Sequence, residues 1–106
     1  MRSIGGKMLE RDIVKRIINY INKNKKITGF AWKNHGNSYS VKGLPDVMAV
    51  IRKDDKSFFI CLEVKRPGNK PTEIQEHFIR KFNDLGIVAE VVTSLKEVIE
   101  IIDNLK

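Results

Sequence analysis

The sequence predicts an α/β fold in which a mixed sheet is flanked by helices. Three segments carry apolar residues at helical spacing, and four shorter runs between them are apolar or alternating. Turn-forming and polar residues mark most of the boundaries. The expected order of elements is α-β-β-β-α-β-α. The chain has 106 residues, 42% of them hydrophobic, and no internal repeat or linker. We therefore expect residues 1–106 to form a single domain around one core.

The first helix and the first strand are expected within residues 8–34. The helix, over residues 8–22, is amphipathic because apolar residues recur every four positions and charged residues fall on the other side, and these apolar residues are Leu9, Ile13, Ile17 and Ile21. The polar run 22–26 ends this helix. Residues 28–34 alternate around Phe30 and Trp32 and predict a strand, which a loop rich in turn formers follows.

Two apolar strands are predicted at residues 47–51 and 58–64, on either side of a polar turn around Asp54 and Asp55. Both runs are apolar at consecutive positions, which is typical of strands that are buried on both faces. We expect them to lie centrally in a sheet that is covered on both sides.

The last third of the chain predicts a helix, a strand and a second helix. Thr72 caps the first of these helices, and Gly86 ends it. Residues 88–93 form the fourth strand. Ser94 followed by Glu97 is a capping box that begins the last helix.

Basic residues give the chain a net charge of +7. Residues 1–70 hold 16 basic and 6 acidic residues, whereas residues 71–106 hold 4 and 7. A basic region of this kind is typical of a phosphate-binding face, and it equally fits a solvated basic surface. Charge alone does not separate a nuclease from a protein that only binds nucleic acid.

Membrane insertion and disulfide formation are not expected. No apolar run exceeds about five residues, whereas a membrane-spanning helix needs about 20, and the first residues lack the apolar segment of a signal peptide. The single cysteine, Cys61, excludes an internal disulfide and a cysteine-based zinc cluster. We expect a cytoplasmic protein that does not bind membranes.

Two acids and a lysine are predicted to converge at the strand ends. If the turn centres on Asp54 and Asp55, Asp46 lies opposite Glu63, and Lys65 shares their face. Opposed carboxylates repel unless positive charge lies between them, and a hard divalent cation, Mg²⁺ or Mn²⁺, suits oxygen ligands. The alternative is that both acids are surface residues and Lys65 pairs with one of them. The same register pairs Met48 with Cys61 and Val50 with Phe59.

At these residues the sequence resembles the PD-(D/E)xK nuclease superfamily and, within it, the VRR-NUC (virus-type replication-repair nuclease) family. The resemblance runs from Glu10 to about Ser94 and implies a restriction-endonuclease-like α-β-β-β-α-β-α core. It rests on Gly43-Leu44-Pro45-Asp46, Glu63-Val64-Lys65 and Gln75.

The resemblance implies a role for each of these residues. Asp46 and Glu63 are the expected metal ligands, with the backbone carbonyl of Val64 and the carboxylate of Glu10 as further contacts. Lys65 is expected to orient the attacking water and to stabilise charge on the phosphate. Gln75 is expected to support the lysine or a substrate phosphate.

Several of these assignments have alternatives. Gln75 also completes a capping box with Thr72, and Glu10 fits an ordinary exposed helix glutamate. His35 is a candidate general base or phosphate contact, although a lone loop histidine is more often neither. Basic and polar residues around the acids are expected to contact nucleic acid, or to be solvated, namely Lys33, Ser40, Lys42, Arg66 and Lys70.

The activity implied by the resemblance is metal-dependent, structure-selective cleavage of DNA. The expected substrate is branched or junction DNA, and the expected enzyme is a homodimer of the Holliday junction resolvase type in a bacterial or phage-infected cell. Two alternatives stay open. One is a non-catalytic DNA-binding accessory protein that retains the nuclease fold, and the other is a restriction-type nuclease that reads sequence on linear duplex.

Overall fold

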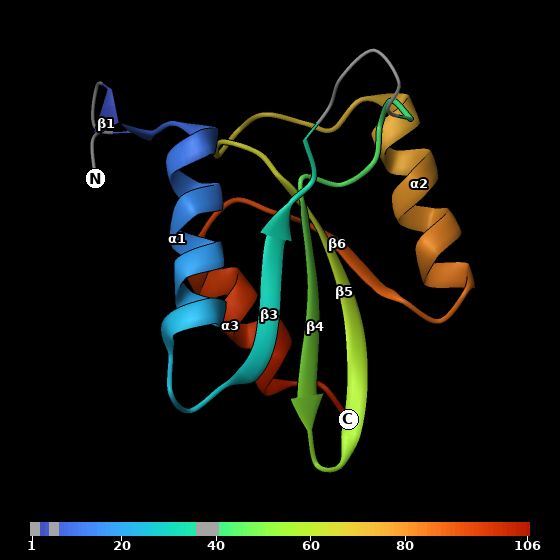
Figure 1. Cartoon of the computed structure of the whole chain (residues 1–106). Coiled ribbons are helices and arrows are strands. Elements are labelled where there is room, and N and C mark those ends of the chain that lie inside the picture. The colour runs from blue at the N-terminus through green and yellow to red at the C-terminus, as the bar shows by residue number, and fades with distance from the viewer. Residues whose placement is uncertain (1–2, 5–6, 36–40) are drawn as a thin grey trace.

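A four-stranded mixed sheet with helices on both sides makes up most of the structure (Figure 1). The structure is a computed structural model, which describes residues 3–4, 7–35 and 41–106. The elements in chain order are β1 (Ser3–Ile4), β2 (Lys7–Met8), α1 (Glu10–Lys23), β3 (Thr28–Lys33), β4 (Val47–Lys53), β5 (Lys56–Val64), α2 (Glu73–Asp84), β6 (Val88–Val92) and α3 (Leu95–Asp103). From α1 onward this order is the predicted one.

The sheet order is β3-β4-β5-β6, antiparallel except for the parallel pair β5 and β6. β4 and β5 form a hairpin whose two turn residues, Asp54 and Asp55, have φ of 52° and 63°. Positive φ at both positions is the geometry of a type I′ turn, which matches the twist of the paired strands and fixes their register. Met48 therefore pairs with Cys61 and Val50 with Phe59, which confirms the predicted register.

One face of the sheet is covered by α1 and α3 and forms the core. Alternate residues of β4 and β5 point to this face and are fully buried, while α1 and α3 bury one apolar stripe each against them. The main contributors are Ile13, Ile17 and Ile21 of α1, Val47, Ala49 and Ile51 of β4, and Val98 and Ile102 of α3.

The other face is covered only in part, so the prediction of a sheet covered on both faces is wrong. β4 and β5 are central, as expected, but Val50 and Phe59 are 38% and 41% exposed. The reason is the position of α2, which packs against β5 and β6 and leaves β3 and β4 open (Figure 1). None of the residues of α2 is buried.

Each edge of the sheet is capped by an asparagine amide. Asn22 of α1 donates to the Ala31 carbonyl at 2.9 Å and accepts from the Ala31 amide at 2.7 Å. Asn83 of α2 makes the same pair of bonds with Ala89 of β6, both at 3.0 Å. These amides satisfy backbone groups that would otherwise be available to another strand.

Two short strands of the N-terminal part were not predicted from the sequence. β1 and β2 form a small antiparallel pair, in which Ser3 pairs with Met8 and Ile4 with Lys7. Strands of two residues are too short to produce a periodic pattern.

Across the described part of the chain, no helix has the length and apolar character needed to span a bilayer.

Candidate active site

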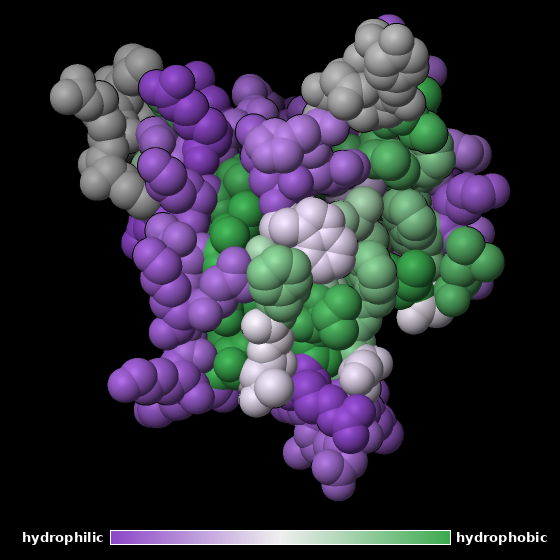
Figure 2. Space-filling model, viewed as in Figure 1, coloured by the Kyte–Doolittle hydropathy of each residue, from purple (hydrophilic) through white to green (hydrophobic). Residues whose placement is uncertain are grey.

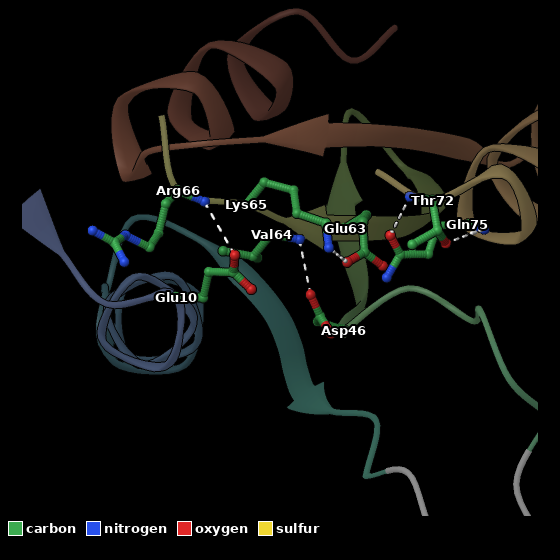
Figure 3. A network of polar contacts seen from close by, with 8 residues as sticks. All are labelled: Glu10, Asp46, Glu63, Val64, Lys65, Arg66, Thr72 and Gln75. Carbon is green, nitrogen blue, oxygen red and sulfur yellow. Dashed lines mark hydrogen bonds and ion pairs between the residues drawn. The ribbon is translucent and has the colours of Figure 1, made fainter. Parts of the chain in front are cut away.

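Asp46 lies where the chain enters β4 and is fixed by backbone contacts on both sides. Its Oδ2 atom accepts a hydrogen bond from the Val64 amide of β5 at 3.0 Å, and its carbonyl accepts one from the Asn34 amide at 2.7 Å (Figure 3). The bond from Asn34 continues the pairing of β4 with β3 by one residue, and the bond from Val64 ties the Asp46 side chain to β5. The Asp46 carboxylate is therefore held over the end of β5, beside Glu63.

The segment before Asp46 depends on glycine. Gly43 has φ of +88°, and a Cβ atom there would lie 2.9 Å from Cγ1 of Ile74 in α2. Only glycine combines this backbone conformation with this close approach. Gly43 thus lets the segment that leads to Pro45 and Asp46 pass directly against α2.

Glu63 is the buried acid of the site and is 1% exposed. Lys65, two residues further along the chain, places its Nζ atom 3.6 Å from Oε2 of Glu63. The other oxygen, Oε1, is buried and has no hydrogen-bond partner. An unpaired carboxylate oxygen is unfavourable in a buried position unless a proton or a cation compensates for its charge.

The pKa of the Glu63 carboxyl group reflects this environment. It is raised from 4.5 to about 8, mainly by burial and next by the neighbouring Asp46, whereas Lys65 acts in the opposite direction. One ammonium group is therefore insufficient to keep both acids ionised near neutral pH. The site requires a bound proton or a second positive charge.

A divalent cation fits this donor set. Two carboxylates converge, and one of their oxygens is buried without a partner. Hard oxygen donors suit Mg²⁺ or Mn²⁺. Among the described residues, no group of three or more histidine, cysteine, aspartate or glutamate side chains is placed to hold a metal ion. The protein side chains alone thus offer two close carboxylates, and further ligands would come from backbone or solvent.

Glu10, the first residue of α1, lies at the same end of the sheet. Its Oε2 atom accepts a hydrogen bond from the Arg66 amide at 3.4 Å (Figure 3). This bond links the start of α1 to the chain directly after Lys65. The structure thus brings Glu10 near the site but gives its carboxylate a backbone partner.

Gln75 takes part in the capping box that begins α2. Its Oε1 atom accepts from the Thr72 amide at 2.8 Å, and its own amide donates to Thr72 Oγ1 at 3.3 Å. The capping interpretation of Gln75 is therefore observed. The cap uses the side-chain oxygen and the backbone amide of Gln75, so the side-chain nitrogen takes no part in it. In Figure 3 the Gln75 side chain lies between Thr72 and Glu63.

The residues predicted to contact nucleic acid are spread over two surfaces. Arg66 follows Lys65 directly, Lys70 lies further along the same loop before α2, and Lys42 precedes the Asp46 segment at an exposed position. Lys33 instead lies beside α1, where it lines a hollow of about 390 Å³ together with Arg11 and Lys15. Ser40 lies outside the described residues, and His35 is exposed at the end of β3.

Arg11 and Lys15 were not among the nucleic-acid contacts predicted from the sequence. Both lie on the polar side of α1, where charged residues are expected on any amphipathic helix. Their shared hollow with Lys33 forms only when β3 packs against α1. Their spacing of four residues, on the same helix face, was the one local signal.

Cys61 is excluded as a nucleophile. Burial raises the pKa of its thiol to about 11, so the thiolate form is not populated near neutral pH. Its Sγ atom donates to Met48 Sδ at 3.4 Å. The cysteine therefore packs as a small, buried apolar residue.

A mixed sheet flanked by helices, with two acids and a lysine at one end, defines a nuclease-type fold. The VRR-NUC domain family matches residues 6–96 of this chain. That match spans most of the sequence, and the chain belongs to the VRR-NUC family. Both the predicted family and the predicted fold are confirmed. As a nuclease domain, it is also expected to bind DNA.

Solved structures agree with this fold. A chain described as a VRR_NUC domain is 22% identical, with a TM-score of 0.69, and the likeness covers 92% of this chain and 97% of that one. A VRR_NUC domain protein is 20% identical, with a TM-score of 0.71, covering 92% of this chain and 87% of that one. At these identities the likeness shows the fold alone. The comparison with curated proteins found no match.

Proposed function

We propose that this protein is a metal-dependent endonuclease that hydrolyses phosphodiester bonds in branched or junction DNA. The observation that carries the proposal is the buried carboxylate of Glu63, which lies beside Asp46 with one oxygen unpartnered. A protein that only binds DNA gains nothing from two repelling acids, since both disfavour the approach of phosphate. Metal-dependent hydrolysis uses such a pair to hold the cation.

Asp46 and Glu63 are the residues that would hold Mg²⁺ or Mn²⁺, with the Val64 carbonyl as a further oxygen ligand and Glu10 as a contact to metal-bound water. Such a cation, when bound, polarises the scissile phosphodiester and activates water for in-line attack. The Val64 amide keeps Asp46 in place through its bond to Oδ2. Glu63 is fixed because it is buried near the end of a central strand.

Lys65 supplies the fixed positive charge of the site. Its ammonium group lies 3.6 Å from Glu63 Oε2, and its side chain is 14% exposed. In that position it can contact both a carboxylate and a phosphate oxygen. Charge that develops on the phosphate in the transition state is stabilised by such a preorganised ammonium group. The amide nitrogen of Gln75 is a second donor on the same side.

DNA would be held through its phosphates. Arg66 and Lys70 lie in the loop that follows Lys65, and Lys42 lies in the segment before Asp46, while Arg11, Lys15 and Lys33 offer a second group of cations beside α1. Contacts of this kind position the backbone without reading its sequence. We therefore propose selection by DNA shape. Symmetric incision of two strands, as in a Holliday junction resolvase, requires two such sites and hence a homodimer.

The test is a cleavage panel. Purified protein is incubated with Mn²⁺ or Mg²⁺ and with labelled four-way junction, flap, linear duplex and single-stranded DNA. Branched substrates should be cut, and Asp46→Asn, Glu63→Gln and Lys65→Met should each lower the rate by about 100-fold or more. Glu90→Gln on β6 and Lys56→Met on β5 change exposed residues of the same sheet and serve as matched controls.

Two results would contradict the proposal. Intact substrates under all metal conditions would exclude nuclease activity, and salt-sensitive DNA binding by that inactive protein, unchanged by the three substitutions, would then identify a DNA-binding accessory protein. Sequence-dependent cutting of linear duplex would identify a restriction-type nuclease.

A further inference from the structure

The hollow between α1 and the edge strand β3 combines an apolar floor with a basic rim. Val14 is buried and Ile18 is half-buried at the floor, whereas the other lining residues are exposed and polar. Figure 2 shows this combination as green, apolar surface between the purple side chains over α1 and the residues over β3. We call this hollow the α1–β3 groove, and its lining residues are Arg11, Val14, Lys15, Ile18, Asn19 and Lys33.

Three cations of the α1–β3 groove have no counter-ion. Arg11 and Lys15 are one helical turn apart, with their Cβ atoms separated by about 6 Å. Lys33 faces α1 from β3, because it lies on the same side of the strand as the buried Ala31 two residues earlier. Within the described part of the chain, none of these three cations forms an ion pair or a side-chain hydrogen bond, and no acid lines the groove. The rim therefore favours an anionic ligand.

The apolar floor indicates which form of nucleic acid fits the α1–β3 groove. A duplex presents phosphates on its outside and keeps its base faces stacked, so rim contacts alone would leave Val14 and Ile18 uncovered. An unpaired nucleotide exposes its base between two phosphates, and sites for such bases combine cations with apolar walls. The groove volume of about 390 Å³ lies in the range of sites for one small organic group. Asn19 adds a donor and an acceptor that suit the edge of a base.

Both walls of the α1–β3 groove lead to the candidate active site. On the strand side, Lys33 directly precedes Asn34, whose amide donates to the Asp46 carbonyl at 2.7 Å. On the helix side, Arg11 directly follows Glu10, which lies at the same end of the sheet as the acids. A DNA strand that crosses the acids can therefore continue round the end of β3 into the groove.

We infer that the α1–β3 groove binds an unpaired nucleotide of a DNA strand, with the base and sugar over Val14 and Ile18 and the flanking phosphates on the rim cations. The part of the groove in cleavage rests on the proposed function. Flaps and opened branch points supply unpaired nucleotides beside the cut, whereas an intact duplex must first unpair and unstack one. The groove thus gives a physical basis for the selection of branched DNA over linear duplex.

Binding is measured without cleavage, in EDTA, by the fluorescence anisotropy of labelled oligo(dT) and of a duplex of equal length. The double variant Lys15→Gln/Lys33→Gln removes one cation from each wall of the α1–β3 groove. For oligo(dT), its plot of log affinity against log salt should become shallower by about 1.4, since each phosphate contact to a single strand contributes about 0.7. Lys23→Gln/Lys56→Gln removes two exposed cations outside the groove and is the matched control of equal net charge, whose slope should stay near that of wild type.

A variant of the floor separates an unpaired nucleotide from a duplex backbone. Ile18→Thr keeps every cation and removes apolar surface, so binding of oligo(dT) should weaken by about threefold or more, while binding of the duplex should not change. Urea unfolding checks that the variant is folded. Amide chemical shifts of wild-type protein locate the nucleotide without any substitution, because titration with oligo(dT) should move the signals of Lys15, Ile18 and Asn19.

Several results would overturn the inference. Absence of oligo(dT) binding, equal effects of the groove and control double variants, or shifts confined to other surfaces would exclude the α1–β3 groove. Equal weakening of duplex and oligo(dT) by Ile18→Thr would make it a duplex site, and equal affinity for thymidine monophosphate would make it a site for free nucleotides. The two proposals also fail separately. Groove binding by a protein that cuts no DNA refutes only the nuclease, and cleavage of flapped DNA at the wild-type rate by both groove variants refutes only the groove.

Discussion

Replacement of Glu63 by glutamine tests the electrostatics of the site. In the folded protein the pKa of Glu63 is raised from 4.5 to about 8 by burial and by Asp46. Between these two values the folded protein keeps a proton that the unfolded chain releases. The free energy of unfolding therefore decreases as the pH rises through this window, and the stabilising contribution is complete only below the lower value. Glu63→Gln preserves the shape of the side chain and removes the titration.

The magnitude follows from the pKa difference. One pKa unit corresponds to about 1.4 kcal/mol, so a rise from 4.5 to about 8 corresponds to at most about 5 kcal/mol over the window. Rearrangement of Lys65 and entry of water around the ionised group reduce this value to a few kcal/mol. Glu63→Gln also removes the ion pair with Lys65, and this changes the free energy of unfolding of the variant by an amount that varies little with pH.

Urea unfolding in the presence of a chelator measures the effect. The difference in unfolding free energy between Glu63→Gln and wild type should shift in favour of the variant between about pH 5 and about pH 8.5. Glu90→Gln, at an exposed position of β6, should show no comparable trend. Mn²⁺ should stabilise the wild type at the higher pH and leave the variant nearly unchanged. A difference that is flat with pH would refute the reasoning, because Glu63 would then titrate alike in both states.

Three further predictions concern single contacts. Lys65→Met should reduce the cleavage rate by about 100-fold without weakening Mn²⁺ binding in calorimetry, and a parallel loss of Mn²⁺ binding would make the lysine a structural residue. Gln75→Glu keeps the acceptor of the capping box, so its urea-unfolding free energy should stay within about 0.5 kcal/mol of wild type while cleavage slows; full activity would restrict Gln75 to the cap. Asn22→Ala and Asn83→Ala should each destabilise the protein by about 1–3 kcal/mol and increase light scattering, and unchanged values for both would contradict edge capping.

The approach of Asp46 to Glu63 was predictable from the sequence because the turn of a hairpin determines its register. A two-residue turn at Asp54 and Asp55 determines every pair along β4 and β5, and side-chain alternation then determines which residues share a face. Asp46 and Glu63 are brought together by this local rule. The contact between Glu10 and the Arg66 amide joins residues 56 apart in the sequence, and no local pattern indicates it.

The open face was not predictable by the same reasoning. An apolar run such as residues 58–64 has the same appearance whether a helix of its own chain or another molecule covers it. Coverage depends on how far α2 reaches across the sheet, which is a property of the packed structure. The bidentate bonds of Asn22 and Asn83 were missed for a similar reason, since a single asparagine on the polar side of a helix has no distinctive pattern.

The alternation of side chains along β5 explains why the Glu63 carboxylate stays buried beside Asp46 despite their repulsion. Leu62 and Val64, on either side of it, are both 0% exposed and point into the core. Glu63 can move away from Asp46 only if these two side chains leave the core, which costs several kcal/mol. The Val64 amide, which donates to the Asp46 carboxylate, and the Lys65 amide, which donates to the Val92 carbonyl, fix the strand end further. The repulsion between the acids is therefore relieved only by positive charge, from a proton, from Lys65 or from a bound cation.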